Sequence, residues 1–334
     1  MKKIDAELYW HLRNEMTRIR HFEETTGQMY GLRKIGGFCH LYNGQEAVAA
    51  GFSAALDHER DYVLTGYRDH GHALVAGLSP DEIMAELFGK ITGSSRGKGG
   101  SMHLFDPKQH FLGGNGIVGA QIPVAVGVAF AQKYQKTGGA TVVFFGDGAI
   151  HQGAFHEALN LAKIWNLPAV LVCENNQWGM GTGWKRVSAV DDFSLMASAY
   201  GVRGERVDGM DVMAVYDAAQ RALVDAREGK PVLLEARTYR YKGHSMSDPQ
   251  KYRTREEVDE YKKQDPIYML EQVMKEAGVW DEAKAQAQDD DAEAMVARAV
   301  EFAESSAEPA MHTIYEDIYA GEPFFMGRDS SWQS

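Results

Sequence analysis

The sequence predicts an α/β protein built on a doubly wound parallel sheet. Two continuous runs of apolar or β-branched residues, 141–145 and 169–173, are typical of buried parallel strands. The amphipathic segment between them, from about 149 to 165, predicts a helix. Because parallel strands are joined by a crossover that is usually helical, the three segments form one βαβ unit.

Shorter signals on either side of this unit support the same fold class. Residues 122–134 are small and apolar and predict a helix beside the first strand, while 232–235 predict another buried strand. The sequence Ser-Pro-Asp-Glu at 79–82 has the pattern of a capping box, so a helix should run from there to about Phe88. A Gly/Ser-rich loop over 93–100 follows that helix.

Both ends of the chain predict helical extensions. Near the N-terminus, residues at helical spacing form an apolar stripe: Tyr9, Leu12, Met16, Ile19 and Phe22. A second capping box at 254–257 opens the last part of the chain, which becomes acidic and alanine-rich over 283–304. There, one helix side carries Ala292, Met295, Val296, Ala299 and Val300. We therefore predict one domain over 1–334, with an N-terminal helical extension (1–30) and a C-terminal one (254–334).

Composition narrows the class of protein. With 334 residues, of which 44% are hydrophobic, the chain can bury a sizeable core. The net charge of −12 argues against a nucleic-acid partner. Cys39 and Cys173 are the only cysteines, which fits a reducing compartment without disulfides. No signal peptide and no apolar stretch long enough to cross a bilayer is apparent, so we expect a cytoplasmic protein with no membrane contact.

The residues that follow the two central strands predict a metal–diphosphate site. Asp147 stands in Gly-Asp-Gly directly after the first strand, and Asn176 follows the second. The carboxyl ends of parallel strands line the ligand crevice of an open sheet. Mg²⁺ prefers oxygen ligands, shared between side chains and phosphates. The amide of Gly148 would open a helix whose N-terminus favours phosphate. Taken alone, the same residues would also suit an ordinary helix cap and turn.

The spacing from Gly-Asp-Gly to Asn175-Asn176 resembles the thiamine diphosphate signature. The chain as a whole, from about Phe22 to Tyr319, resembles the alpha subunit of the decarboxylating component of 2-oxo acid dehydrogenase complexes, the pyruvate-specific members most of all. Five blocks in the right order carry the resemblance: 37–42, 66–70, 97–103, 113–119 and 239–249.

The resemblance implies roles for particular residues. The cofactors would be thiamine diphosphate and Mg²⁺. Asp147, Asn176 and the backbone carbonyl of Trp178 match the metal ligands. Tyr67 and Arg68 match the diphosphate contacts, and Gly148, Ala149 and His244 would also bind the cofactor. Gly116 and Val118 match positions whose main-chain atoms hold the aminopyrimidine ring, where a glycine lets the backbone approach closely.

Two of the twelve histidines are candidates for catalysis. His40 and His244 match histidines near the reacting carbon and the cofactor phosphates, where an imidazole can donate to an oxyanion or move a proton. His70 and His103 are weaker candidates for the same neighbourhood. Most histidines are structural, so we expect the others to have packing or surface roles.

The loop over 242–253 resembles the loop that closes over the cofactor and is phosphorylated in mitochondrial relatives. Ser245 occupies the matching serine position. The segment after Pro249 is one residue shorter than the mitochondrial pattern, and its second serine is missing. A polar lid without phosphorylation is the better interpretation.

The resemblance also implies partners. The carboxylate that activates the cofactor lies in the beta subunit of two-chain members, and no residue of this sequence obviously replaces it. We therefore expect an α2β2 heterotetramer with the cofactor at the α–β interface, and an isolated chain without activity. The expected reaction is oxidative decarboxylation of pyruvate, a small 2-oxo acid, with transfer of the acetyl group to a lipoyl carrier on the transacylase of the complex.

Other interpretations remain open at this point. Residues 155–161 resemble the acetoin-cleaving enzymes. A branched-chain 2-oxo acid would suit the same chemistry, although residues 174–182 depart from the branched-chain pattern. Residues 251–257 look like the pyruvate type. A more distant alternative is a non-catalytic phosphate-binding module that reuses an α/β crevice.

Overall fold

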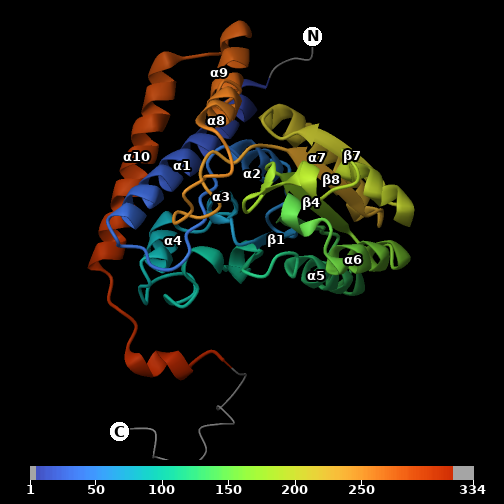
Figure 1. The fold of residues 1–334 in the computed structure, drawn as a ribbon, viewed down its shortest axis with the longest axis horizontal. Helices are drawn as coiled ribbons and strands as arrows, with labels where there is room; N and C mark the ends of the chain where they lie inside the picture. Colours follow the sequence, from blue (N-terminus) through green and yellow to red (C-terminus); the bar gives the residue numbers. More distant parts are fainter. Residues whose placement is uncertain (1–4, 319–334) are drawn as a thin grey trace, which may run out of the picture.

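A six-stranded parallel sheet forms the centre of the molecule (Figure 1). The computed structural model describes residues 5–318. In spatial order the strands are β2 (Phe111–Asn115), β1 (Tyr62–Gly66), β3 (Thr141–Gly146), β4 (Ala169–Asn175), β8 (Val232–Arg237) and β7 (Arg203–Asp208). Every neighbouring pair in this sheet is parallel. The predicted fold class, a doubly wound parallel sheet, is confirmed.

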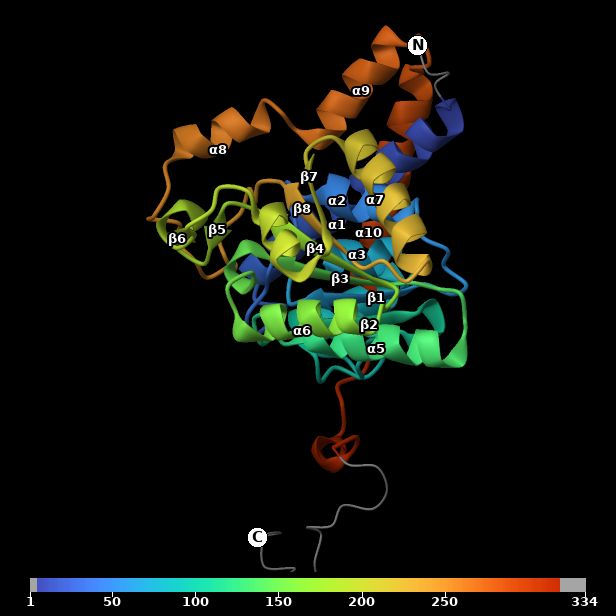
Figure 2. The same cartoon turned by 90° about the vertical axis from the view of Figure 1, so that its right-hand side faces the viewer.

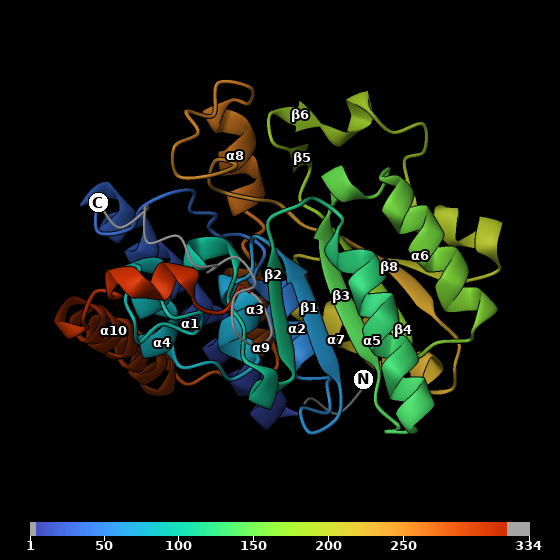
Figure 3. The ribbon, with the colours of Figure 1, turned by 90° about the horizontal axis from the view of Figure 1, so that it is seen from below.

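Helices cover both faces of the sheet. Helices α5 (Gln121–Gln135) and α6 (Gly153–Ile164) lie side by side on one face, and α2 (Glu46–Ser53) and α7 (Val212–Arg227) cover the other (Figure 2; Figure 3). Alternate side chains of a strand point to opposite faces. Val142 and Phe144 of β3 accordingly belong to one apolar core, while Val143 and Phe145 belong to the other. Burial on both faces explains why β3 and β4 are apolar throughout.

The terminal helices pack against each other beside the sheet. Helix α1 (Ala6–Gly31) contacts α9 (Pro266–Glu276) and α10 (Glu282–Ser305), and α10 also packs along α4 (Pro80–Leu87) (Figure 1). The apolar stripe predicted for α1 is buried except for the partly exposed Tyr9, and the one predicted for α10 is buried except for the partly exposed Val300. Within the described residues, none of the helices has the length and apolarity needed to cross a membrane. The part of the predicted C-terminal extension beyond 318 lies outside those residues.

Short elements complete the chain. Helix α3 (His70–Val75) follows β1, and helix α8 (Arg255–Lys262) lies in the chain between β8 and α9. Strand β5 (Trp178–Gly179) pairs with β6 (Thr182–Gly183) in an antiparallel hairpin. The remaining helical turns are 3₁₀ segments: η1 (Gly100–Met102), η2 (Pro107–Gln109), η3 (Asp147–Ala149), η4 (Trp184–Arg186), η5 (Phe193–Tyr200) and η6 (Met311–Tyr315).

Two helix starts differ from the prediction. The helix expected from about residue 149 begins at Gly153, because Asp147–Ala149 form a separate 3₁₀ turn. Ser79 stands at the N-cap of α4, but its side chain makes no capping hydrogen bond, so the first capping box does not form. The second one forms in half: the hydroxyl of Thr254 accepts the amide of Glu257 at the start of α8, 3.2 Å away, while the carboxylate of Glu257 accepts hydrogen bonds from Trp178 and Tyr239.

The loop after α4 is organised around one buried carboxylate. Glu86 is fully buried near the end of α4 and accepts four backbone N–H groups from the Gly/Ser loop. The donors are Ser95 (2.8 Å), Gly97 (2.8 Å), Gly99 (2.7 Å) and Gly100 (3.0 Å). The charge and the hydrogen-bonding capacity of a buried glutamate are thus satisfied entirely by backbone amides.

Strand order places a crevice between β1 and β3. From β1 the chain goes to β2 on one side of the sheet, and the later strands β3 and β4 add on the other side. Such a reversal is a topological switch point, and ligands of open α/β sheets bind there, beyond the carboxyl ends of the strands.

Candidate functional site

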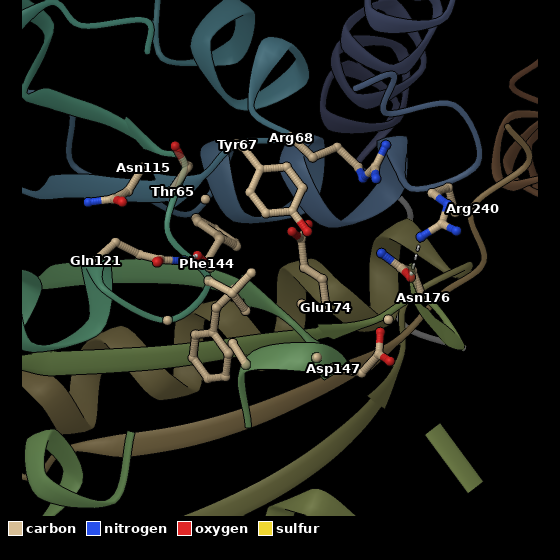
Figure 4. Close-up of a pocket in the computed structure, with 18 of the residues that line it drawn as sticks. Thr65, Tyr67, Arg68, Asn115, Gln121, Phe144, Asp147, Glu174, Asn176 and Arg240 are labelled. Atoms are coloured by element: carbon tan, nitrogen blue, oxygen red, sulfur yellow. Dashed lines mark hydrogen bonds between the residues drawn. The ribbon is translucent and has the colours of Figure 1, made fainter. Parts of the chain in front are cut away.

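A cavity of about 280 Å³ opens at this switch point (Figure 4). Its walls come from the carboxyl ends of β1, β3 and β4 and from the loops that follow them. Eight of the residues singled out from the sequence line it: Tyr67, Arg68, Val118, Asp147, Gly148, Ala149, Asn176 and Trp178. Three others do not line it: Gly116, His40 and His244.

Asp147 and Asn176 come from neighbouring strands and lie on the same side of the cavity (Figure 4). β3 and β4 pair in register through Gly146 and Glu174, which brings the residues after them together. The carboxylate of Asp147 is buried, and burial raises its pKa to about 6, although Arg240 and Arg68 act in the opposite direction. A buried carboxylate of this kind is poised to accept a cation or a hydrogen-bond donor.

The amide of Asn176 has a defined orientation. Its nitrogen donates to Oε1 of Gln45 at 3.1 Å, while its oxygen accepts from the guanidinium of Arg240 at 3.5 Å. The dashed line in Figure 4 marks this second contact. Gln45, at the N-cap of α2, therefore turns the oxygen of Asn176 away from itself.

The turn at Gly148 presents backbone atoms to the cavity in a different way from that expected. Gly148 and Ala149 do line the cavity, but they lie in the 3₁₀ turn η3 and not in the first turn of α6. The prediction that an α-helix begins at Gly148 is therefore wrong.

Two buried guanidinium groups dominate the electrostatics of the cavity. Arg68 donates to the carbonyls of Leu41 (2.6 Å) and His244 (2.7 Å). Arg240 is almost fully buried and reaches the carbonyl of Trp178 at 2.8 Å. Within residues 5–318, no carboxylate forms an ion pair with either group. Burial, and after it the charge of Arg240, lower the pKa of Arg68 to about 10. Buried charges without a counter-ion are costly, so this pair favours an anionic ligand.

His40 and His244 form a ring cluster with Tyr67 at the edge of the cavity. The ring centroids of His40 and His244 are 5.1 Å apart, and that of Tyr67 lies 4.5 Å from His40 and 5.6 Å from His244. Burial, and then the charge of Arg68, lower the pKa of His244 to about 4 and that of His40 to about 2. Both imidazoles are therefore neutral at physiological pH. The Nδ1 atoms of both are buried without a hydrogen-bond partner in the part of the chain described.

We expect Arg68→Gln to raise the pKa of His244 toward its ordinary value, because the substitution removes the second cause of the shift. NMR titration of labelled histidine side chains in the two proteins measures this change, with Arg206→Gln, outside the cavity, as the control. In the wild type the folded pKa lies below the unfolded one. His244 should therefore contribute to a loss of stability as the pH falls from about 6.5 to about 4, with no further loss below that. An unchanged pKa in Arg68→Gln would contradict this account.

The weaker histidine candidates have structural partners. His70 is fully buried, and its Nδ1 lies 2.9 Å from the carboxylate of Glu23. His103 lies with Nδ1 3.1 Å from the carbonyl of Gly114, and a Cβ added at Gly116 would meet its ring at 3.4 Å. Gly116 thus belongs to a tightly packed turn next to the cavity and not to its wall.

Several residues that line the cavity had no role in the sequence analysis. Chief among them is Arg240, together with Gln45, His72 and Glu174. Glu174 accepts a short hydrogen bond from the hydroxyl of Tyr42 and lies 3.3 Å from Nε2 of His72. Arg240 stands within one of the sequence blocks that carry the resemblance, which was the one available signal. Nothing in its local pattern distinguishes it from a surface arginine.

The loop over 242–253 folds against the cavity. Arg253 donates to the carbonyls of Arg240 (2.5 Å), Tyr241 (2.9 Å) and Lys242 (2.5 Å) and so closes the loop on itself. Ser245 is buried, and its hydroxyl lies 3.0 Å from that of Ser247. In this arrangement the hydroxyl of Ser245 is not accessible to a kinase.

The fold and the two buried guanidiniums of the cavity define a class: an α/β protein with a cavity suited to an anionic ligand at the switch point of a parallel sheet. Comparison with known proteins makes the class specific. Residues 14–312 match the family described as dehydrogenase E1 component, and this chain belongs to that family. Membership implies the use of thiamine diphosphate and a complex with a beta subunit.

Curated relatives cover nearly the whole chain. The pyruvate dehydrogenase E1 component subunit alpha of Rhizobium meliloti is 48% identical over 319 residues, which are 95% of this chain and 90% of the relative. The protein of the same name from Zymomonas mobilis is 48% identical over 320 residues, with the same shares. The mitochondrial subunit of Dictyostelium discoideum is 45% identical over 311 residues, 92% of this chain and 81% of its own length.

Proposed function

We propose that this chain is the alpha subunit of a pyruvate dehydrogenase. With a beta subunit it would decarboxylate pyruvate oxidatively and pass the acetyl group to a lipoyl carrier. The observation that carries the proposal is the pair of buried guanidiniums beside Asp147 and Asn176 at the switch point, neither of which forms an ion pair within residues 5–318. The relatives named as pyruvate dehydrogenase alpha subunits support the choice of substrate.

The residues of the cavity fit a diphosphate held with Mg²⁺. Tyr67, Arg68 and Arg240 would hold the diphosphate, since planar guanidiniums suit phosphate oxygens. Asp147, Asn176 and the carbonyl of Trp178 would hold the metal. In the described chain, no group of three or more His, Cys, Asp or Glu side chains could bind a metal alone. Oxygens from the diphosphate and water would have to complete the shell.

The remaining site residues would orient the cofactor and serve the reacting carbon. Gly116 and Val118 would hold the aminopyrimidine ring through backbone and apolar contacts. Thiamine diphosphate, when bound, supplies the electron sink for decarboxylation. His244 and His40, both neutral, could donate a hydrogen bond to a developing oxyanion or move a proton at a ring nitrogen. The rest of the chain's share is positioning and exclusion of water.

Exposed apolar side chains on α5 and after α6 suggest a surface that binds a partner subunit. Phe130 and Tyr134 of α5 and Trp165 after α6 are exposed and lie in contact, with Phe130 5.4 Å from Trp165 and 6.4 Å from Tyr134 between ring centroids. Ile117, also exposed, adjoins the cavity residue Val118. Aromatic residues are enriched at interfaces. We propose an α2β2 heterotetramer in which the beta chain supplies the activating carboxylate.

The test is an assay of the chain co-expressed with its beta partner, using a dye acceptor, with and without thiamine diphosphate and Mg²⁺. Cofactor-dependent turnover of pyruvate above branched-chain 2-oxo acids and acetoin is expected, and the chain alone should be inactive. Preference for acetoin or a branched-chain acid would contradict the proposed substrate but not the proposed use of thiamine diphosphate. A folded complex that does not bind thiamine diphosphate would contradict the proposed function and would favour a non-catalytic module.

A further inference from the structure

Arg240 contacts two of the three oxygens that the proposed metal site would use. Its Nη1 lies 2.8 Å from the carbonyl of Trp178 and 3.5 Å from Oδ1 of Asn176. Figure 4 shows the guanidinium directed at Asn176 on the side where Asp147 also points. A positively charged side chain thus already binds the oxygens proposed as metal ligands.

The rest of the guanidinium is anchored to the loops that cover the cavity. Nη2 donates to the hydroxyl of Tyr252 (3.0 Å) and to the carbonyl of Met180 (3.3 Å). Nε donates to the carbonyl of Lys242 (3.2 Å). Tyr252 in turn donates to Asp248 at 2.6 Å, and the same carboxylate accepts the amide of His244 at 2.7 Å. A continuous set of hydrogen bonds therefore joins the proposed metal oxygens to the lid.

A cation and this guanidinium cannot use the site independently. Each of these oxygens has two lone pairs, but a guanidinium and a metal ion on the same oxygens place two positive charges at close range, where they repel each other. The guanidinium of Arg240 therefore opposes a divalent cation at Asn176 and Trp178, and a shift of Arg240 away from them favours the cation. A diphosphate attracts both groups, so it favours the shifted guanidinium and the bound cation together.

On the basis of the proposed function, we propose that Arg240 excludes the divalent cation from the Asn176–Trp178 oxygens until a diphosphate is present. The cation and the diphosphate then bind cooperatively, and Arg240 carries a large part of the coupling. Couplings between ligands are typically about 5- to 150-fold in affinity. The lid loses its anchor to Arg240 in the same event, which links cofactor binding to lid rearrangement.

The test measures binding of Mn²⁺ to the cofactor-free complex of this chain and its beta partner, by electron paramagnetic resonance of free Mn²⁺. Wild type should bind Mn²⁺ weakly alone and much more tightly with thiamine diphosphate. Arg240→Gln should tighten binding of Mn²⁺ alone by roughly 10-fold or more. Arg68→Gln is the matched control: it removes the same charge from the same cavity but does not touch those oxygens, so its effect should be under about 3-fold.

A milder variant keeps the test valid if Arg240→Gln does not fold. Tyr252→Phe removes one anchor of the guanidinium and should tighten Mn²⁺ binding alone in the same direction by a few-fold. Equal effects of Arg240→Gln and Arg68→Gln, or wild-type binding of Mn²⁺ alone as tight as with thiamine diphosphate, would overturn the inference and leave the metal site standing. No Mn²⁺ binding by any variant, even with thiamine diphosphate, would overturn the proposed site as well.

Discussion

Asp147→Asn is expected to lower cofactor-dependent turnover by about 100-fold or more. Asp147 is the one carboxylate among the three proposed metal oxygens, and asparagine keeps its size but not its charge. Loss of a single well-placed electrostatic partner in an active site commonly costs about 10²–10³ in rate. The measurement is pyruvate turnover of the complex with the beta subunit at saturating thiamine diphosphate and Mg²⁺.

Stability should change in the opposite direction to activity. The carboxylate of Asp147 is buried, and burial raises its pKa to about 6, so the folded protein keeps a charge there at a cost. We expect the melting temperature of Asp147→Asn to match or exceed that of the wild type in the absence of cofactor. Asp211→Asn is the control, because this residue caps α7 outside the cavity and asparagine caps helices equally well. Full turnover by Asp147→Asn would contradict the assignment of Asp147 to the metal.

Glu86→Ala is expected to lower the free energy of unfolding by about 3–5 kcal/mol. The carboxylate accepts four backbone N–H groups from a single loop, and alanine would leave these donors without a partner. Removing one member of a buried charged network commonly costs about this much. Glu86→Gln should cost less, since the amide keeps one oxygen as an acceptor. Chemical denaturation monitored by circular dichroism measures both.

Glu82→Ala is the matched control for that experiment. Glu82 lies one turn earlier on α4 and is exposed, so its replacement should change stability by less than about 0.5 kcal/mol. If Glu86→Ala and Glu82→Ala proved equally stable, the carboxylate would not organise the loop. A loss confined to cofactor binding, with stability unchanged, would have the same meaning.

Three neighbouring strands, β3, β4 and β8, could be predicted from sequence, whereas the interior strand β1 and the edge strands β2 and β7 were not. β3 and β4 are covered on both faces, so their residues are apolar throughout and stand out from the pattern. β2 contains Gly113 and Gly114, which weaken any strand signal, and the edge strand β7 is mostly charged, with Val207 as its only large apolar residue. Edge strands need not be apolar, because one side faces solvent.

The site was predictable where a residue type follows directly from its place on a strand. Asp147 and Asn176 follow the central strands, and the structure brings them to one cavity, although their role as metal ligands stays a prediction. Arg240 and Gln45 could not be identified in this way. Their positions depend on tertiary contacts between segments far apart in the chain, which no local pattern encodes. The 3₁₀ turn at Asp147–Ala149 was likewise hidden, since its sequence is compatible with a helix.

The packing of α1 against α9 and α10 has a consequence for how the chain folds during synthesis. Trp10, Leu12 and Met16 of α1 share an apolar cluster with Leu270 and Met274, and the later part of α1 packs in the core that includes Ala303. The first helix to leave the ribosome therefore completes its native packing only when nearly the last helix has been synthesised. Helices α2 and α3 cover part of its apolar face early, but at about 5–20 residues per second the cover from α9 and α10 is missing for tens of seconds. Nascent chains that end before α10 should therefore depend on chaperones, whereas the complete chain closes its first and last helices together.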